Sequence, residues 1–220
     1  MARKTKAEAA LTKDRIVTCA RQVFARDGVT NTSLEEVARV AGVTRGAVYW
    51  HFRNKADLFM AVRSQTGLLI QLGQAKVGDP LQRLENGLLQ ALQRLSEETA
   101  AQETYEVMLW KCEYVGEFAQ VRDDLIGSGR LFLDDAETLY REARAAGIVA
   151  ANLDPKTAAV ATFCFYAGIL KIWLGDTRGT ILRQHAQQAI AHHIAQQRRI
   201  PLAATRQVDR RGPPAKDSSP

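Results

Sequence analysis

Between Ser33 and Phe52 the sequence predicts two short helices joined by a turn of about three residues. Ser33 and Glu36 form an S-x-x-E capping box, the pattern that satisfies backbone N–H groups at the start of a helix. Gly42 stands where the first helix is expected to end, and Thr44 can cap the second. This pattern is typical of a helix-turn-helix, whose second helix enters the major groove of DNA. Other helical proteins also contain glycine turns, so the pattern alone does not establish DNA binding.

Positive charge is concentrated in the same part of the chain. The 220 residues carry a formal net charge of +6. Residues 1–63 contain twelve Lys and Arg against six Asp and Glu, whereas the remaining residues carry eighteen of each sign. Such an imbalance favours a chain in which one part meets a polyanion. The arm containing Arg3, Lys4 and Lys6 either reaches the adjacent minor groove or is an ordinary solvated terminus.

Helical periodicity recurs along the rest of the chain, and strand signals are almost absent. We therefore expect an all-α fold with nine helices. The first is expected to be capped by Thr12 and to end at Gly28, and the fourth to be capped by Asn54 and to run to about Leu72. After a break at 73–80, five longer helices are expected. They begin at Pro80, cover 103–119 and 121–146, begin again at Pro155 after an Asp154 cap, and cover about 180–197.

Helix periodicity divides the second helix of the helix-turn-helix into two sides. At about 100° per residue, Val48 and Phe52 share one side, and Arg45, Gly46 and Tyr49 share another. We expect the first pair to pack against Phe24, Val37 and Ala41, which leaves the second set exposed.

The exposed set has the chemistry of base contacts. Arg45 can bind guanine O6 and N7, Gly46 allows close approach of the backbone, and Tyr49 offers its ring to a thymine methyl group. Expected phosphate contacts are Trp50, His51, Lys55 and the hydroxyl groups of Thr32 and Ser33. Alternatively, Trp50 is a wedge between helices, His51 is a structural histidine and Arg45 is an ordinary solvated charge.

The stretch TSLEEVARVAGVTRGAVYWHFRNKADLF resembles the DNA-binding signature of the tetracycline-repressor (TetR) family. With the MARKTK start, it is similar to that family's branch of multidrug-efflux repressors. Weaker similarity continues through KCEY at 111–114 and the helix at 154–173. The resemblance implies a homodimer with three helices per subunit in a DNA-binding head and six in a ligand-binding body. It implies DNA contacts at Thr44, Arg45, Gly46, Tyr49, Trp50, His51 and Lys55.

The resemblance also implies the domains and the function. We expect a DNA-binding domain at 1–55 with a flexible basic arm at 1–10, a ligand-binding and dimerisation domain at 56–200, and a disordered tail at 201–220. The expected function is repression of a multidrug-efflux operon, relieved when a hydrophobic compound binds the body. The alternatives are a TetR-like regulator of another, metabolic operon and a helical module that binds protein through its exposed aromatic residues.

Family resemblance places a ligand pocket among the fourth to eighth helices, although apolar stripes at helical spacing are more often plain core. Tyr105 and Tyr166 are the few polar groups expected there, so the ligand should be large and mostly apolar. The expected lining residues are Leu84, Leu88, Ala91, Tyr105, Met108, Leu109, Cys112, Phe132, Ala136, Phe163, Tyr166, Ala167 and Leu170.

The helix after Asp154 is apolar nearly all round and must be covered on both sides. We expect core on one side and a second subunit on the other, so that the last two helices form the dimer. The expected partners are therefore operator DNA, a hydrophobic effector and a second copy of the chain. We expect no apolar run as long as the roughly 18 residues of a membrane span, which favours a cytoplasmic protein with no membrane partner.

Signatures of enzymes are missing from the sequence. It contains no nucleophile elbow, glycine-rich phosphate loop or H-E-x-x-H motif, so we expect neither an enzyme nor a cofactor. His185, His192 and His193 are spaced too far apart or point apart on a helix, so no metal site is expected. Cys19, Cys112 and Cys164 are expected to be unpaired and buried.

Overall fold

The computed structural model describes residues 6–72 and 77–199, and within this part of the chain it contains nine α-helices and no strand. The expected all-α fold is confirmed. The helices are α1 (Lys6–Asp27), α2 (Leu34–Val40), α3 (Arg45–His51), α4 (Lys55–Thr66), α5 (Pro80–Glu97), α6 (Thr99–Trp110), α7 (Ala119–Ala145), α8 (Pro155–Gly175) and α9 (Ala186–Gln197), with a 3₁₀ turn, η2 (Gly116–Phe118), before α7.

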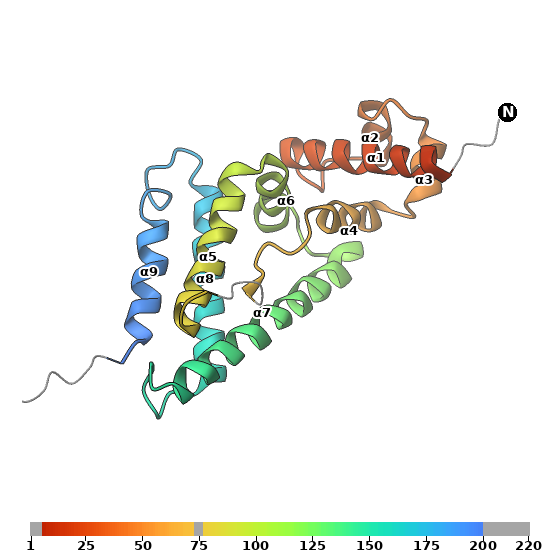
Figure 1. The fold of residues 1–220 in the computed structure, drawn as a ribbon. Helices are drawn as coiled ribbons and strands as arrows, with labels where there is room; N and C mark the ends of the chain where they lie inside the picture. The colour runs from red at the N-terminus through yellow and green to blue at the C-terminus, as the bar shows by residue number, and fades with distance from the viewer. Residues whose placement is uncertain (1–5, 73–76, 200–220) are drawn as a thin grey trace, which may run out of the picture.

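The molecule is elongated, with α1–α3 at one end and α5, α8 and α9 at the other (Figure 1). Helices α4 and α6 lie between the two ends, and the long α7 runs obliquely along one side of the molecule toward α4. Helix α1 packs against α4 and α6, and α7 packs against α5 and α8.

Side-chain caps start the helices of the helix-turn-helix. The side-chain oxygens of Ser33, Thr44 and Asn54 accept hydrogen bonds from the N–H groups of the third residue after each, at 3.1, 3.2 and 2.8 Å. These three predicted caps are confirmed. The second half of the predicted capping box is not seen, because the carboxylate of Glu36 pairs with Arg26 at 3.0 Å instead.

Four helices begin or end at residues other than those predicted. Thr12 lies inside α1, where its hydroxyl donates to the carbonyl of Glu8. Helix α4 stops at Thr66 and not at Leu72, because Gly67 adopts a φ of 67°, which a side chain strongly disfavours. Helix α6 spans Thr99–Trp110 and not 103–119, since the carbonyl of Lys111 accepts from Val29 N at 2.9 Å. Helix α9 begins at Ala186 and not near 180.

Asp176 accounts for the late start of α9. Its carboxylate accepts hydrogen bonds from the backbone N–H groups of residues 180–183, at 2.9–3.2 Å. These N–H groups are therefore satisfied by a side chain in a loop, and not by a helical ladder.

The buried residues form two clusters. One surrounds Phe24, Phe52 and Phe59 and joins α1–α4 to the end of α6 and the start of α7. The other fills the space among α5–α9 and includes Leu69 and Leu72 from the segment after α4. The chain boundary at residue 55 stays a prediction; the first half of α4 packs with the helices that precede it. The predicted tail at 201–220 lies outside the described residues.

Helix α8 corrects two expectations. Among the described helices it alone is long and apolar enough to cross a membrane by length and composition, a test that core helices of soluble proteins also pass. Only 39% of its most apolar stretch is buried in this chain. Cys164, expected to be buried, lies on its exposed part, whereas Cys19 and Cys112 are half-buried, and all three are free thiols.

We predict that Asp176 makes stability depend on pH. The hydrogen bond from Leu182, with those from its neighbours, lowers the pKa of the Asp176 carboxyl to about 2. A carboxyl whose pKa is lower in the folded than in the unfolded state, where it is about 3.9, stabilises the fold above that value. This stabilisation is lost as the pH falls from about 4 toward 2. Urea titrations should therefore show Asp176→Asn less stable than wild type at pH 7, with the difference shrinking at pH 2–3. A difference independent of pH would contradict this account.

Candidate DNA-binding surface and ligand cavity

The two sides of α3 lie in different surroundings. Val48 and Phe52 are buried in the cluster that contains Phe24, Val37 and Ala41, as the periodicity predicts. Arg45, Gly46 and Tyr49 are exposed on the opposite side. Burial of one side therefore anchors the helix, and the other side is free to meet a partner.

Two neighbours contact the exposed side chain of Arg45. Its Nε lies 2.9 Å from the carboxylate of Glu35 on α2, and its guanidinium carbon lies 5.2 Å from the centre of the Tyr49 ring. Both members of the ion pair are well exposed, so the pair contributes little to stability. Arg45 can therefore leave Glu35 and bind another anion.

Gly46 has no internal reason to be glycine. Its φ is not positive, and a Cβ atom at this position would meet only the Thr44 hydroxyl oxygen, at 4.0 Å. A side chain at Gly46 would extend outward at the start of α3. This favours the interpretation that an external partner approaches the backbone closely here.

Trp50 and His51 form the next part of the surface. The Trp50 side chain is 72% exposed, so it is not a wedge between helices. Its ring meets the His51 ring edge-on, with centroids 4.5 Å apart. His51 is half-buried and lines hollows on both sides of α3, one toward α1 and one toward α4.

Three expected phosphate contacts have structural roles in this conformation. Thr32 is only 3% exposed and its hydroxyl donates to the carbonyl of Gly28, so the structure does not place it on the surface. The Ser33 hydroxyl caps α2 and is exposed. The Lys55 ammonium donates to the carbonyls of Thr30 and Thr32, at 3.1 and 2.9 Å, and so holds the loop before α2. Of the expected arm residues, Lys6 is exposed at the start of α1, whereas Arg3 and Lys4 lie outside the described residues.

A cavity of about 650 Å³ lies between α4, α6, α7 and α8. Eight of the expected residues line it: Tyr105, Met108, Leu109, Phe132, Phe163, Tyr166, Ala167 and Leu170. Its size falls within the range of small-molecule sites, and most of its lining is apolar.

Five expected lining residues lie elsewhere. Leu84, Leu88, Ala91 and Ala136 are almost fully buried in the core of the body. Cys112 packs against the cluster around Phe59, and burial raises the pKa of its thiol to about 11. Spacing on a helix predicts that these residues face inward, but does not tell core from cavity.

One wall of the cavity was not predicted, because residues 67–72 were expected to be part of a helix. These residues line the cavity together with Arg63, Leu125, Gly129, Leu131 and Asp135. The signal available in the sequence was Gly67, a residue that commonly ends helices.

Both phenol groups of the cavity already have partners. The Tyr166 hydroxyl donates to the carbonyl of Leu88 at 2.9 Å, and the Tyr105 hydroxyl bonds to the backbone of Leu69. Burial raises the pKa of both phenols, so both are neutral. Both tyrosines line the cavity as expected, and each already makes one hydrogen bond to the backbone.

Polar contacts join α4 to the body. The Thr66 hydroxyl donates to that of Thr104 on α6, at 2.8 Å, and this pair is buried. Arg94 on α5 donates to the carbonyls of Thr66 and Leu68, at 2.6 and 2.9 Å. On the other face of α6, Glu103 pairs with Arg21 of α1 at 2.9 Å. The end of α4 is therefore bonded to α5 and to α6, and α6 forms one wall of the cavity.

The histidines considered as metal ligands have other neighbours. His193 stacks on Phe165 with centroids 4.1 Å apart, and His192 contacts Gln196. The described residues contain no group of three or more His, Cys, Asp or Glu placed to hold a metal ion.

Two family models match the chain. One, described as "Bacterial regulatory proteins, tetR family", matches residues 16–62, and the other, "MAATS-type transcriptional repressor, C-terminal region", matches residues 79–197. Among curated proteins, the HTH-type transcriptional regulator AcrR of Shigella flexneri is 36% identical over 196 residues, covering 87% of this chain and 91% of AcrR.

Solved structures agree. NalD, titled the secondary repressor of the MexAB-OprM multidrug efflux pump in Pseudomonas aeruginosa, superposes with a TM-score of 0.79 at 30% identity over 88% of this chain and 99% of NalD. A SmeT–triclosan complex gives a TM-score of 0.74 at 26% identity over 87% of this chain and 93% of SmeT. SmeT is titled the repressor of the Stenotrophomonas maltophilia multidrug efflux pump SmeDEF.

We predict that Lys55→Met destabilises the protein in the absence of DNA. Two carbonyls would lose a charged donor, which costs about 1–3 kcal/mol. Arg53→Met is the matched control, because the Arg53 side chain is 93% exposed and lies 3.8 Å from its nearest carboxylate, Asp57. Urea titration should show a lower free energy of unfolding for Lys55→Met and almost none of that loss for Arg53→Met. Equal effects would mean that Lys55 is not a structural residue.

Proposed function

This chain belongs to the TetR family of bacterial regulatory proteins, and we propose that it represses a multidrug-efflux operon and leaves its operator when a hydrophobic compound binds its body. Repression of efflux-pump operons is what the titles of NalD and SmeT describe, and both superpose on most of this chain. The relatives are transcriptional regulators, which supports a DNA-binding regulator and not an enzyme. Because it acts on operator DNA, we place it in the cytoplasm.

The observation that carries the proposal is the exposed start of α3. Arg45, Gly46 and Tyr49 face outward from a helix whose other side is buried. Arg45 offers a bidentate donor for guanine, and Gly46 leaves room for the edge of a base or a phosphate. Trp50 and His51 extend the same surface and supply ring N–H groups for the DNA backbone.

We assign the dimer interface to α8 and α9. Val160, Cys164 and Ile172 lie on the exposed part of α8, an apolar surface that a monomer would leave in water. A second copy packed there places two α3 helices on one DNA face, where half-sites lie about 34–36 Å apart.

Release from DNA follows from a shift between conformations. The cavity is bounded by α4 and the segment after it, and α4 is also bonded to the loop before α2 through Lys55. A ligand that binds better to one position of α4 favours the head position that belongs to it. Operator affinity falls by no more than the ratio of ligand affinities for the two states.

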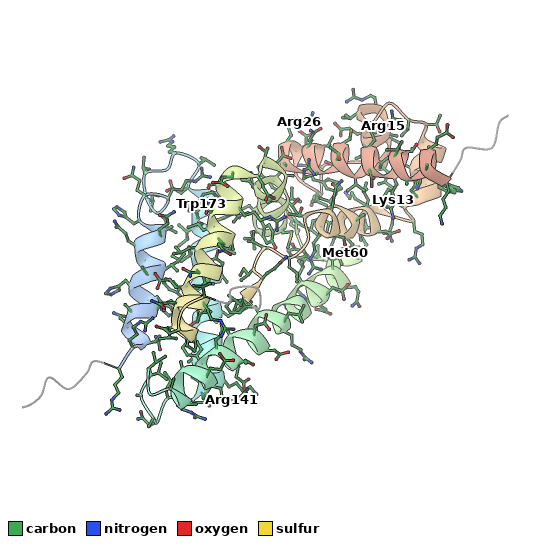
Figure 2. All side chains as sticks on the ribbon, viewed as in Figure 1. Lys13, Arg15, Arg26, Met60, Arg141 and Trp173 are labelled. Atoms are coloured by element: carbon green, nitrogen blue, oxygen red, sulfur yellow. The ribbon has the colours of Figure 1, made fainter. Side chains whose placement is uncertain are left out.

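We predict that Arg45→Ala lowers operator affinity about 10- to 100-fold, the range expected when a bidentate base contact is lost. Arg141→Ala is the matched control, because it removes the same charge at the opposite end of the molecule from α1, where Lys13 and Arg15 lie (Figure 2). Gel shifts on DNA upstream of the gene measure both variants. Indistinguishable affinities would contradict the assignment of α3, and a helical protein-interaction module would show no operator binding at all.

The same gel shifts with triclosan, the ligand in the SmeT structure, test release. Wild-type protein should leave the operator as triclosan is added. An operator affinity that does not respond to triclosan or to other hydrophobic compounds would favour a TetR-like regulator of a metabolic operon.

We predict that Ile172→Glu prevents dimer formation. A glutamate at this half-exposed position would be buried without a partner in the dimer, which costs several kcal/mol and raises the dissociation constant on the order of 100-fold or more. Val115→Glu, at an exposed position in the loop after α6, is the control and should remain dimeric. Size-exclusion chromatography with light scattering measures the mass, and a dimeric Ile172→Glu would contradict this interface.

A further inference from the structure

Arg63 on α4 lines the cavity and is half-buried, unlike most arginines of the chain. Its charge acts on the phenols of Tyr105 and Tyr114: the pKa of each is raised chiefly by burial, and Arg63 opposes that shift. The guanidinium group therefore lies near the α6 wall of the cavity.

Arg63 differs from the other half-buried arginines in having no partner among the described residues. Within residues 6–72 and 77–199, Arg21, Arg83, Arg94 and Arg198 each pair with a carboxylate at 2.9 Å, and Arg183 stacks on Trp173 and donates to its carbonyl. For Arg63 the described part of the chain supplies no hydrogen bond and no ion pair. A guanidinium that is partly removed from water and unpaired favours the binding of an anion.

The other polar groups of the cavity do not meet this demand. The phenols of Tyr105 and Tyr166 are neutral and already bonded to the backbone. Asp135, on α7, is exposed and lies farther than 4 Å from any arginine nitrogen in the described residues, so it does not form an ion pair with Arg63. Arg94, whose charge also acts on the Tyr105 phenol, is bonded to Glu98 and to two carbonyls.

We propose that the cavity takes amphiphilic acids, with Arg63 binding the carboxylate and the apolar walls of α6, α7 and α8 covering the hydrocarbon part. The binding of acids does not depend on the proposed function; only its effect, release from the operator, rests on that function. The acids are then the class of effector. A carboxylate suits the planar donors of a guanidinium, which bind its two oxygens side by side.

The position of Arg63 connects this ligand class to regulation. Arg63 lies one turn before Thr66, whose hydroxyl and carbonyl bond to α6 and α5. Eight residues before Arg63, Lys55 binds the loop that leads into the helix-turn-helix. An anion bound at Arg63 therefore acts directly on the helix that joins the cavity to the head.

The test measures the binding of three ten-carbon probes to the full chain by calorimetry: decanoate, 1-decanol and decyltrimethylammonium. Wild type should bind decanoate at least about tenfold more tightly than 1-decanol, the gain expected of one charge-assisted contact. Arg63→Met should remove this difference and leave the affinity for 1-decanol unchanged. Arg63→Lys should retain part of it.

Arg130→Met is the matched control, because Arg130 is an exposed arginine on α7 that does not line the cavity. It should bind all three probes as wild type does. Equal affinities of wild type for decanoate and 1-decanol, or unchanged decanoate binding by Arg63→Met, would overturn the proposal. A preference for decyltrimethylammonium would also overturn it and would assign the cavity to cations facing Asp135.

Operator binding without any ligand separates the two proposals. If wild type binds its operator and triclosan releases it, but decanoate shows no preference for the cavity, the acid proposal fails and the proposed function stands. If wild type binds decanoate through Arg63 but binds no operator, the proposed function fails and the ligand class stands.

Discussion

Helix α4 has polar partners at both ends, and they come from opposite parts of the molecule. At its start, the ammonium of Lys55 binds two carbonyls of the loop before α2. At its end, Arg94 and Thr104 bind the carbonyl and the hydroxyl of Thr66. Helix ends leave backbone groups unsatisfied, so these contacts are costly to break. The position of the head is therefore tied to the shape of the body through one helix of twelve residues.

Helix α3 also has two roles, although it has only seven residues. One side, with Val48, is buried and fixes the orientation of the helix, while Arg45, Gly46 and Tyr49 are presented to solvent. An exposed Trp50 is costly for a monomer in water but suits a surface that meets DNA. Helices α1 and α4 pack against α6, so the head and the body share one buried cluster.

Local features of the fold could be predicted from the sequence, and features that depend on distant residues could not. The caps at Ser33, Thr44 and Asn54 and the two sides of α3 depend on residues within a few positions of one another. The predicted end of α4 was wrong because Gly67 turns the chain into the body. Residues 67–72 contact α5 and α6 there. Lys55 was interpreted as a phosphate contact because its bonds to Thr30 and Thr32 cross more than twenty residues. Arg63 was missed for a similar reason: its isolation depends on which carboxylates the fold brings near it.

We expect filling of the cavity to move the two heads of the proposed dimer relative to each other. Spin labels on Gln22→Cys, an exposed position on α1, measure this directly by electron–electron double resonance in a variant whose three native cysteines are replaced by alanine. We expect one distribution of distances in the free and operator-bound dimer and a displaced distribution once triclosan occupies the cavity. Superimposable distributions with the cavity empty and occupied would contradict it.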